Sequence, residues 1–139
     1  MRASTTALFS ALLLTACDEE TVCDASAMAS VTITVTDLDG EPLSPTALTY
    51  TIDGGQAQDA ECMSDDCSSA VAGWEQAGVF EITAVLDEEM EGDPCCWYLD
   101  SQTVEVEVTQ GECHVDGQQV EIQLDTDALV CADSTEDCG

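Results

Sequence analysis

Basic side chains are almost absent from this sequence. Its 139 residues include one Lys or Arg, which is Arg2, against 30 Asp and Glu. All 30 acids follow residue 16, so the chain from residue 17 onward carries a side-chain charge of −30, with His114 as its only basic side chain. Proteins bind nucleic-acid phosphates and anionic lipid headgroups through Lys and Arg. The composition therefore excludes nucleic-acid binding and electrostatic docking on an anionic membrane.

Long apolar runs are also missing. No stretch reaches the ~20 residues that a membrane-spanning helix needs. The longest run is "ALFSALLL", residues 7–14, which follows Arg2 and leads into small residues. This length and order are typical of a secretory signal peptide, so we expect the chain to be exported.

The end of the apolar run, "LTAC" at residues 14–17, resembles the lipobox of bacterial lipoproteins. The resemblance implies that residues 1–16 are a signal peptide and that Cys17 becomes the acylated first residue of the mature chain. Two or three acyl chains make a lasting anchor where one holds only marginally. The expected location is the cell envelope, on the periplasmic face or the cell surface, with the membrane as partner through the covalent lipid. The alternative is an ordinary signal peptide cut near Ala16.

Cysteine is abundant, in contrast to the basic residues. With Cys17 assigned to the lipid, eight of the nine cysteines remain (9 − 1 = 8), enough for four disulfides in an oxidising compartment. The disulfide candidates are Cys23, Cys62, Cys67, Cys95, Cys96, Cys113, Cys131 and Cys138.

The spacing of these cysteines does not determine how they pair. Adjacent cysteines rarely bond to each other, so we expect Cys95 and Cys96 to have different partners, one of them Cys113. Zinc binding by these residues with His114 is the alternative, which an oxidising compartment disfavours.

Hydrophobic periodicity indicates an all-β fold. "VTITVT" and "TVEVEV" alternate apolar and polar residues, as half-buried strands do, and no amphipathic helix is evident. We expect a single Ig-like or transthyretin-like antiparallel β-sandwich of about seven strands over residues 31–126. A polar tether at 17–30 would precede it and a Cys-containing tail at 127–139 would follow. The expected strands lie near 31–36, 46–53, 78–86, 102–109 and 117–125, with shorter ones near 56–62 and 68–74.

The stretch "VTITVTDLDGEPLSPTALTYTIDGG" resembles the opening of a carboxypeptidase regulatory-like domain. Asp37, Gly40 and Pro42 match its turn, and Leu48 to Ile52 match its second strand. "GVFEI", at residues 78–82, resembles its entry into a core strand. "CHV", at residues 113–115, resembles a segment that precedes the last strand in lipoproteins carrying this domain.

The resemblance covers about residues 31–124 and implies a transthyretin-like sandwich of the bacterial envelope. In that family the domain is a structural or binding module, and no catalytic residue is carried over to this chain. The "CMSDDC" and "DEEMEGDPCCWYLD" segments lie outside the family pattern.

An acidic segment is the candidate metal site. Clustered carboxylates can share Ca²⁺, and a solvated acidic loop is the alternative. The candidate ligands are Asp87, Glu88, Glu89, Glu91 and Asp93. "DLDG" at residues 37–40 begins like a calcium loop but lacks the later ligands of an EF-hand, so we expect a tight turn there.

Catalytic groups are scarce. His114 is the only candidate base, and no Lys or Arg after residue 16 could stabilise an oxyanion. Trp74 and Trp97-Tyr98 could stack on sugars or peptides or pack against the fold. We therefore expect a lipid-anchored structural or interaction module that is not an enzyme and needs no cofactor. The alternatives are an acidic Ca²⁺-binding envelope protein and, less favoured, a carbohydrate- or peptide-binding module.

Overall fold

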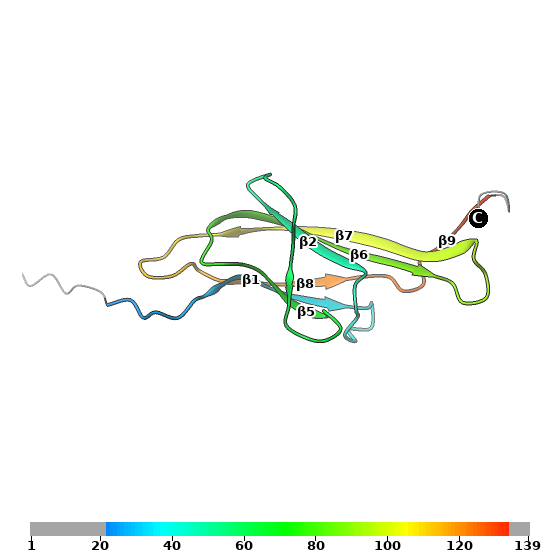
Figure 1. Ribbon diagram of the computed structural model, residues 1–139, viewed down its shortest axis with the longest axis horizontal. Helices are drawn as coiled ribbons and strands as arrows, with labels where there is room; N and C mark the ends of the chain where they lie inside the picture. Colours follow the sequence, from blue (N-terminus) through cyan, green and yellow to red (C-terminus); the bar gives the residue numbers. More distant parts are fainter. Residues whose placement is uncertain (1–21, 134–139) are drawn as a thin grey trace, which may run out of the picture.

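The computed structural model describes residues 22–133 as two packed β-sheets, with no helix in this part of the chain. The four-stranded sheet has the order β4-β5-β1-β8, and the five-stranded sheet has the order β3-β2-β6-β7-β9 (Figure 1). The strands are β1 (Ala29–Thr36), β2 (Ala47–Ile52), β3 (Gln58–Asp59), β4 (Glu61–Cys62), β5 (Ser69–Trp74), β6 (Gly78–Glu89), β7 (Cys96–Val108), β8 (Gln118–Gln123) and β9 (Leu129–Cys131). The prediction of an all-β sandwich is confirmed.

Residues 22–133 contain no helix that is long and apolar enough to cross a membrane. The expected signal peptide at 1–16, the lipidation site Cys17 and the disulfide candidate Cys138 lie outside the described residues.

The core lies between the sheets and follows from the alternating pattern. In β1, Val31, Ile33 and Val35 are fully buried, whereas the intervening threonines are partly or fully exposed. In β6, Phe80 and Ile82 are buried in the same way. Burying a large apolar side chain contributes about 1.5–3 kcal/mol, so the inward-facing positions of the strands hold the two sheets together.

The strand pairing differs from the prediction in one place. β1 pairs antiparallel with β5 but parallel with β8, with Ile33 opposite Val120. Because β7 belongs to the other sheet, the chain crosses between the layers before β8 and enters beside β1 in the same direction. An expectation of purely antiparallel sheets therefore fails at this pair.

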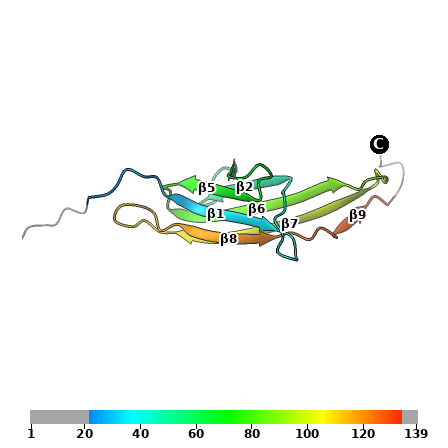
Figure 2. The ribbon, with the colours of Figure 1, turned by 90° about the horizontal axis from the view of Figure 1, so that it is seen from below.

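The long β6–β7 hairpin extends beyond β1, β5 and β8 (Figures 1 and 2). At its far end, β9 pairs with the beginning of β7. The sequence placed residues 127–139 in a tail, but Leu129–Cys131 forms this added edge strand. Such an edge strand needs no alternating pattern, because exposed residues can still pair through their backbone.

The described part of the expected tether is also fastened to the sandwich. Ala29 and Ser30 belong to β1, and the Glu75 backbone N–H donates to the Met28 carbonyl over 2.9 Å. Cys23 is joined to Cys113 by a disulfide. Contacts within residues 23–30, part of the segment predicted as a polar tether, therefore fasten it to one end of the fold.

The expected tight turn after β1 is present. One carboxylate oxygen of Asp37 accepts the backbone N–H groups of Asp39 and Glu41, both over 2.9 Å. Gly40 has a φ of 84°, a left-handed value that favours glycine. Asp37 therefore organises the turn by accepting hydrogen bonds at its side chain from the backbone of the next few residues, and the tight turn is where the sequence predicted it.

Candidate functional site

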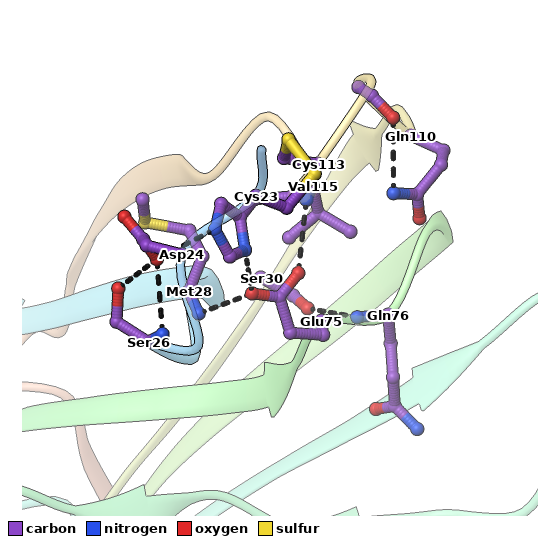
Figure 3. Close-up of polar contacts among 12 residues, drawn as sticks. Cys23, Asp24, Ser26, Met28, Ser30, Glu75, Gln76, Gln110, Cys113 and Val115 are labelled. Atoms are coloured by element: carbon purple, nitrogen blue, oxygen red, sulfur yellow. Dashed lines mark hydrogen bonds and ion pairs between the residues drawn. A yellow bond between two sulfur atoms is a disulfide. The ribbon is translucent and has the colours of Figure 1, made fainter. Parts of the chain in front are cut away.

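A polar cluster around His114 connects three separate segments of the chain. Figure 3 shows its neighbours Asp24, Glu75 and Val115. The Nδ1 atom of His114 lies 2.5 Å from Oε1 of Glu75, and its Nε2 atom lies 3.1 Å from Oδ1 of Asp24. His114 lies between β7 and β8, Glu75 follows β5, and Asp24 precedes β1. The cluster therefore joins the N-terminal segment to the β5–β6 connection and to the β7–β8 connection.

Glu75 is placed by an unusual backbone conformation. Its φ is 52°, which is uncommon for a residue with a side chain. Its Oε1 accepts the Met28 N–H over 2.7 Å, and its Oε2 accepts the Val115 N–H over 3.2 Å. The next residue, Gln76, donates its N–H to the hydroxyl of Ser30 over 2.9 Å. These bonds turn the chain out of β5 and hold the carboxylate under the imidazole.

The cluster shifts the pKa values of its members in opposite directions. Hydrogen bonding to Glu75 raises the pKa of His114, and Asp24 adds to this. Hydrogen bonding from the Met28 N–H lowers the pKa of Glu75, with His114 contributing. Hydrogen bonds from the hydroxyl and N–H of Ser26 lower the pKa of Asp24, with a further contribution from His114. The arrangement therefore favours an imidazolium between two carboxylates.

This geometry places both ring nitrogens of His114 in contact with carboxylates. A neutral imidazole has one N–H and so can donate to only one of the two carboxylates, whereas the charged ring donates to both. Both ring nitrogens are occupied in this way, and the side chain is 22% exposed. The cluster is therefore suited to fastening segments together.

One disulfide reinforces the same connection, and two others lie elsewhere in the fold. Cys23 bonds to Cys113, the residue before His114. Cys62 bonds to Cys67, and Cys96 bonds to Cys131 across the β7–β9 pair.

Two predictions about these cysteines are tested. Cys95 is also disulfide-bonded, and Cys96 has Cys131 as its partner, so the two neighbours do not bond to each other, as predicted. The expectation that one of them pairs with Cys113 is wrong, because Cys23 occupies that position. With Cys95, Cys96 and Cys113 all oxidised, none offers zinc a thiolate.

The structure distributes the candidate Ca²⁺ ligands along the β6–β7 hairpin. Asp87, Glu88 and Glu89 are exposed on β6, where successive side chains point to opposite faces. Glu91 and Asp93 follow, and Asp93 Oδ1 accepts the Cys95 N–H over 3.0 Å in the turn. Within residues 22–133, no group of three or more Asp, Glu, His or Cys side chains is arranged to hold a metal ion.

The aromatic candidates have different surroundings. Trp97 and Tyr98 are half-buried in β7, opposite Glu89 and Glu88 of β6. Tyr98 packs against the core. Trp74, at the end of β5, is 41% exposed and borders an open pocket of about 350 Å³.

Sequence reasoning did not identify the His114 cluster or this pocket. Asp24 and Glu75 lie 90 and 39 residues from His114, and their neighbours carry no motif that marks them among the thirty acids. The one available signal was that His114 is the only basic side chain after residue 16, so any ion pair there had to involve it.

Comparison with known proteins found no matching family model, no matching curated protein and no matching solved structure.

Proposed function

We propose that this chain is an exported, lipid-anchored interaction module of the bacterial cell envelope that does not catalyse a reaction. The observation that carries the proposal is the disulfide bonding of this small sandwich, which includes Cys23–Cys113, Cys62–Cys67 and Cys96–Cys131, with Cys95 disulfide-bonded as well. Disulfides form and persist in exported proteins and are rare in the cytosol.

The N-terminal sequence supports the anchoring part of the proposal. An apolar segment of signal-peptide length ends at the lipobox-like "LTAC", and the acidic chain offers no basic patch for a membrane surface. A covalent lipid on Cys17 would therefore supply the membrane attachment. The resemblance to carboxypeptidase regulatory-like domains agrees with a binding or structural role.

The arrangement of the N-terminal segment suits such an anchor. Cys23, six residues after Cys17, is bonded to Cys113 at one end of the sandwich. A lipid on Cys17 would then hold the domain close to the membrane by that end.

The test is expression of the full chain beside its Cys17→Ser variant in a bacterium that processes lipoproteins. The parent should partition into the detergent phase, and its intact mass should show the signal removed and acyl chains added. The variant should remain in the aqueous phase with its disulfides formed. Detergent partitioning of both proteins, or a parent mass without acyl chains, would disprove lipid anchoring.

A further inference from the structure

The pocket beside Trp74 lies at the side of the sandwich where the two sheets are bridged. The chain leaves β2, passes through β3, which pairs with β2, and β4, which pairs with β5, and so crosses to the other sheet. Figure 1 shows the path from β2 to β5. The pocket of about 350 Å³ is open to solvent and takes its walls from both sheets, including Tyr50 of β2 and Trp74 of β5. A site of this size admits one side chain or one small organic group.

The crossing segment presents two carboxylates to the pocket. Ala60 lies between β3 and β4 and is buried, with its N–H donating to the Leu48 carbonyl over 2.9 Å. Because side chains alternate along extended chain, Asp59 and Glu61 on either side of Ala60 point away from the core. Both line the pocket.

The indole of Trp74 forms a fixed aromatic wall. Its Nε1–H donates to Oε2 of Glu61 over 3.0 Å, which orients the ring and the carboxylate together. The preceding Gly73 has a φ of 72°, and a Cβ there would lie 2.7 Å from Oε1 of Gln76 and 3.2 Å from the Phe80 ring. Glycine is therefore needed for the chain to place Trp74 at the rim.

The chain has almost no cation of its own for these carboxylates. After residue 16 it contains no Lys or Arg, and the ring of His114 is bonded to Glu75 and Asp24. Both ion pairs recorded among residues 22–133 are those of His114. The charge of the whole domain attracts cations, and a concave site lined by acids strengthens that field locally.

The shape and composition of the pocket favour an organic cation over a metal ion. Ca²⁺ takes six to eight oxygen ligands, and no described group of three acidic, His or Cys side chains is arranged for a metal. A guanidinium can stack on an indole while donating to carboxylates in its plane. A neutral sugar would also stack on the ring but would leave the two charges without a partner.

We infer that the pocket formed by Trp74, Tyr50, Asp59 and Glu61 binds a cationic side chain, with the guanidinium of Arg in a basic peptide as the best match. The inference rests on the proposed function, because it names the kind of partner that an interaction module of this composition would bind. It does not depend on the lipid, and anchoring is measured separately by detergent partitioning.

The experiment titrates the full chain, purified with its disulfides formed, with the blocked peptide acetyl-Gly-Arg-Gly-amide. The matched probe contains citrulline, which has nearly the shape of Arg without its charge. In a Trp97→Phe variant the fluorescence comes from Trp74 alone, since the chain has two Trp. We expect a saturable change in the Trp74 signal in 0.15 M NaCl with the Arg peptide, with a Kd on the order of 1 mM, and none with the citrulline peptide.

Variants separate pocket binding from general attraction to an acidic protein. By calorimetry, Trp74→Leu and Glu61→Gln should each weaken binding of the Arg peptide by roughly five- to thirtyfold, as expected for the loss of one cation–π contact or one close charge. Glu61→Gln keeps an acceptor for the indole N–H. Glu121→Gln, on β8 at the opposite edge of the same sheet, removes the same charge and should have little effect.

Three results would overturn the inference. The first is equal binding of the citrulline and Arg peptides. The second is equal weakening by Glu61→Gln and Glu121→Gln, which would show diffuse attraction. The third is binding of a neutral probe, tri-N-acetylchitotriose, at Trp74 without binding of the Arg peptide, which would make the pocket a sugar site.

Discussion

The Nδ1 atom of His114 lies 2.5 Å from a carboxylate oxygen of Glu75, although the two residues are 39 positions apart. The same Glu75 carboxylate accepts the Met28 and Val115 N–H groups, so one side chain joins the N-terminal segment to the connection before β8. The only basic residue after position 16 is thus used to close one end of the sandwich.

The first prediction concerns the pH dependence of this contact. The pKa of His114 is raised from 6.5, so its contribution is complete below that value and is lost as pH rises through the higher folded-state pKa. The pKa values of Asp24 and Glu75 are lowered from 3.8 and 4.5, so their contribution is complete above those values and is lost as pH falls through the lower folded-state pKa values. The parent should therefore exceed His114→Gln in stability most clearly between pH 4.5 and 6.5.

Urea denaturation of both proteins from pH 3 to pH 9 measures this difference. Subtracting the two curves removes the general repulsion among the acids, which is common to both proteins. Glu112→Gln, which changes an exposed acid two residues away, is the control and should follow the parent. A difference between the parent and His114→Gln that stays constant over the whole range would show that the ion pairs do not contribute.

The second prediction compares two disulfides. Cys23–Cys113 spans 90 residues, whereas Cys62–Cys67 spans 5. In the chain-entropy model the long link should stabilise the fold by about 4 to 5 kcal/mol and the short one by about 2 kcal/mol, because the longer loop restricts the unfolded chain more. Replacing each pair by two serines and measuring the free energy of unfolding tests this. Equal losses, or a larger loss for the short link, would contradict the chain-entropy explanation.

The third prediction contrasts the two faces of β6. Ile82 is fully buried, and Ile82→Val should lower the free energy of unfolding by about 0.5–1.5 kcal/mol, since it removes one buried methylene. Glu81, the preceding residue, is exposed and lies opposite Glu105 of β7. Like charges facing across strands are unfavourable, so Glu81→Gln should raise stability slightly. The urea midpoints of the two variants should move in opposite directions. If both midpoints moved in the same direction, the assignment of buried and exposed faces on β6 would be wrong.

The fourth prediction concerns Ca²⁺. Salt screens the repulsion within a domain of charge −30, so NaCl should raise the melting temperature. Because the structure spreads Asp87, Glu88, Glu89, Glu91 and Asp93 along a hairpin, we expect CaCl₂ at matched ionic strength to add no saturable shift.

The control for Ca²⁺ binding is a pair of triple variants. One changes Glu88, Glu89 and Glu91 to Gln, and the other makes the same change at Glu105, Glu107 and Glu121, so both lose three charges. A saturable Ca²⁺ shift in the parent that only the first variant abolishes would establish the hairpin as a Ca²⁺ site.

The sequence by itself determined which residues face the core. Val31, Ile33 and Val35, or Phe80 and Ile82, recur at every second position, and a strand places such residues on one face whatever its neighbours are. A different local signal, the "DLDG" segment, identified the turn at Asp37, whose side chain bonds the backbone of the next few residues. Near Val106 the rule of alternation is only partly obeyed, since that residue packs against the core but is half-buried.

Only the tertiary structure decided which residues far apart in the sequence come into contact. The parallel β1–β8 pair, the bond from Cys23 to Cys113 and the approach of Trp74 to Glu61 each depend on how the chain crosses between sheets. Thirty acids and nine cysteines give many equivalent pairings in sequence, and local periodicity does not distinguish among them. Packing of the two apolar faces selects one crossing, and that crossing brings His114 to Glu75.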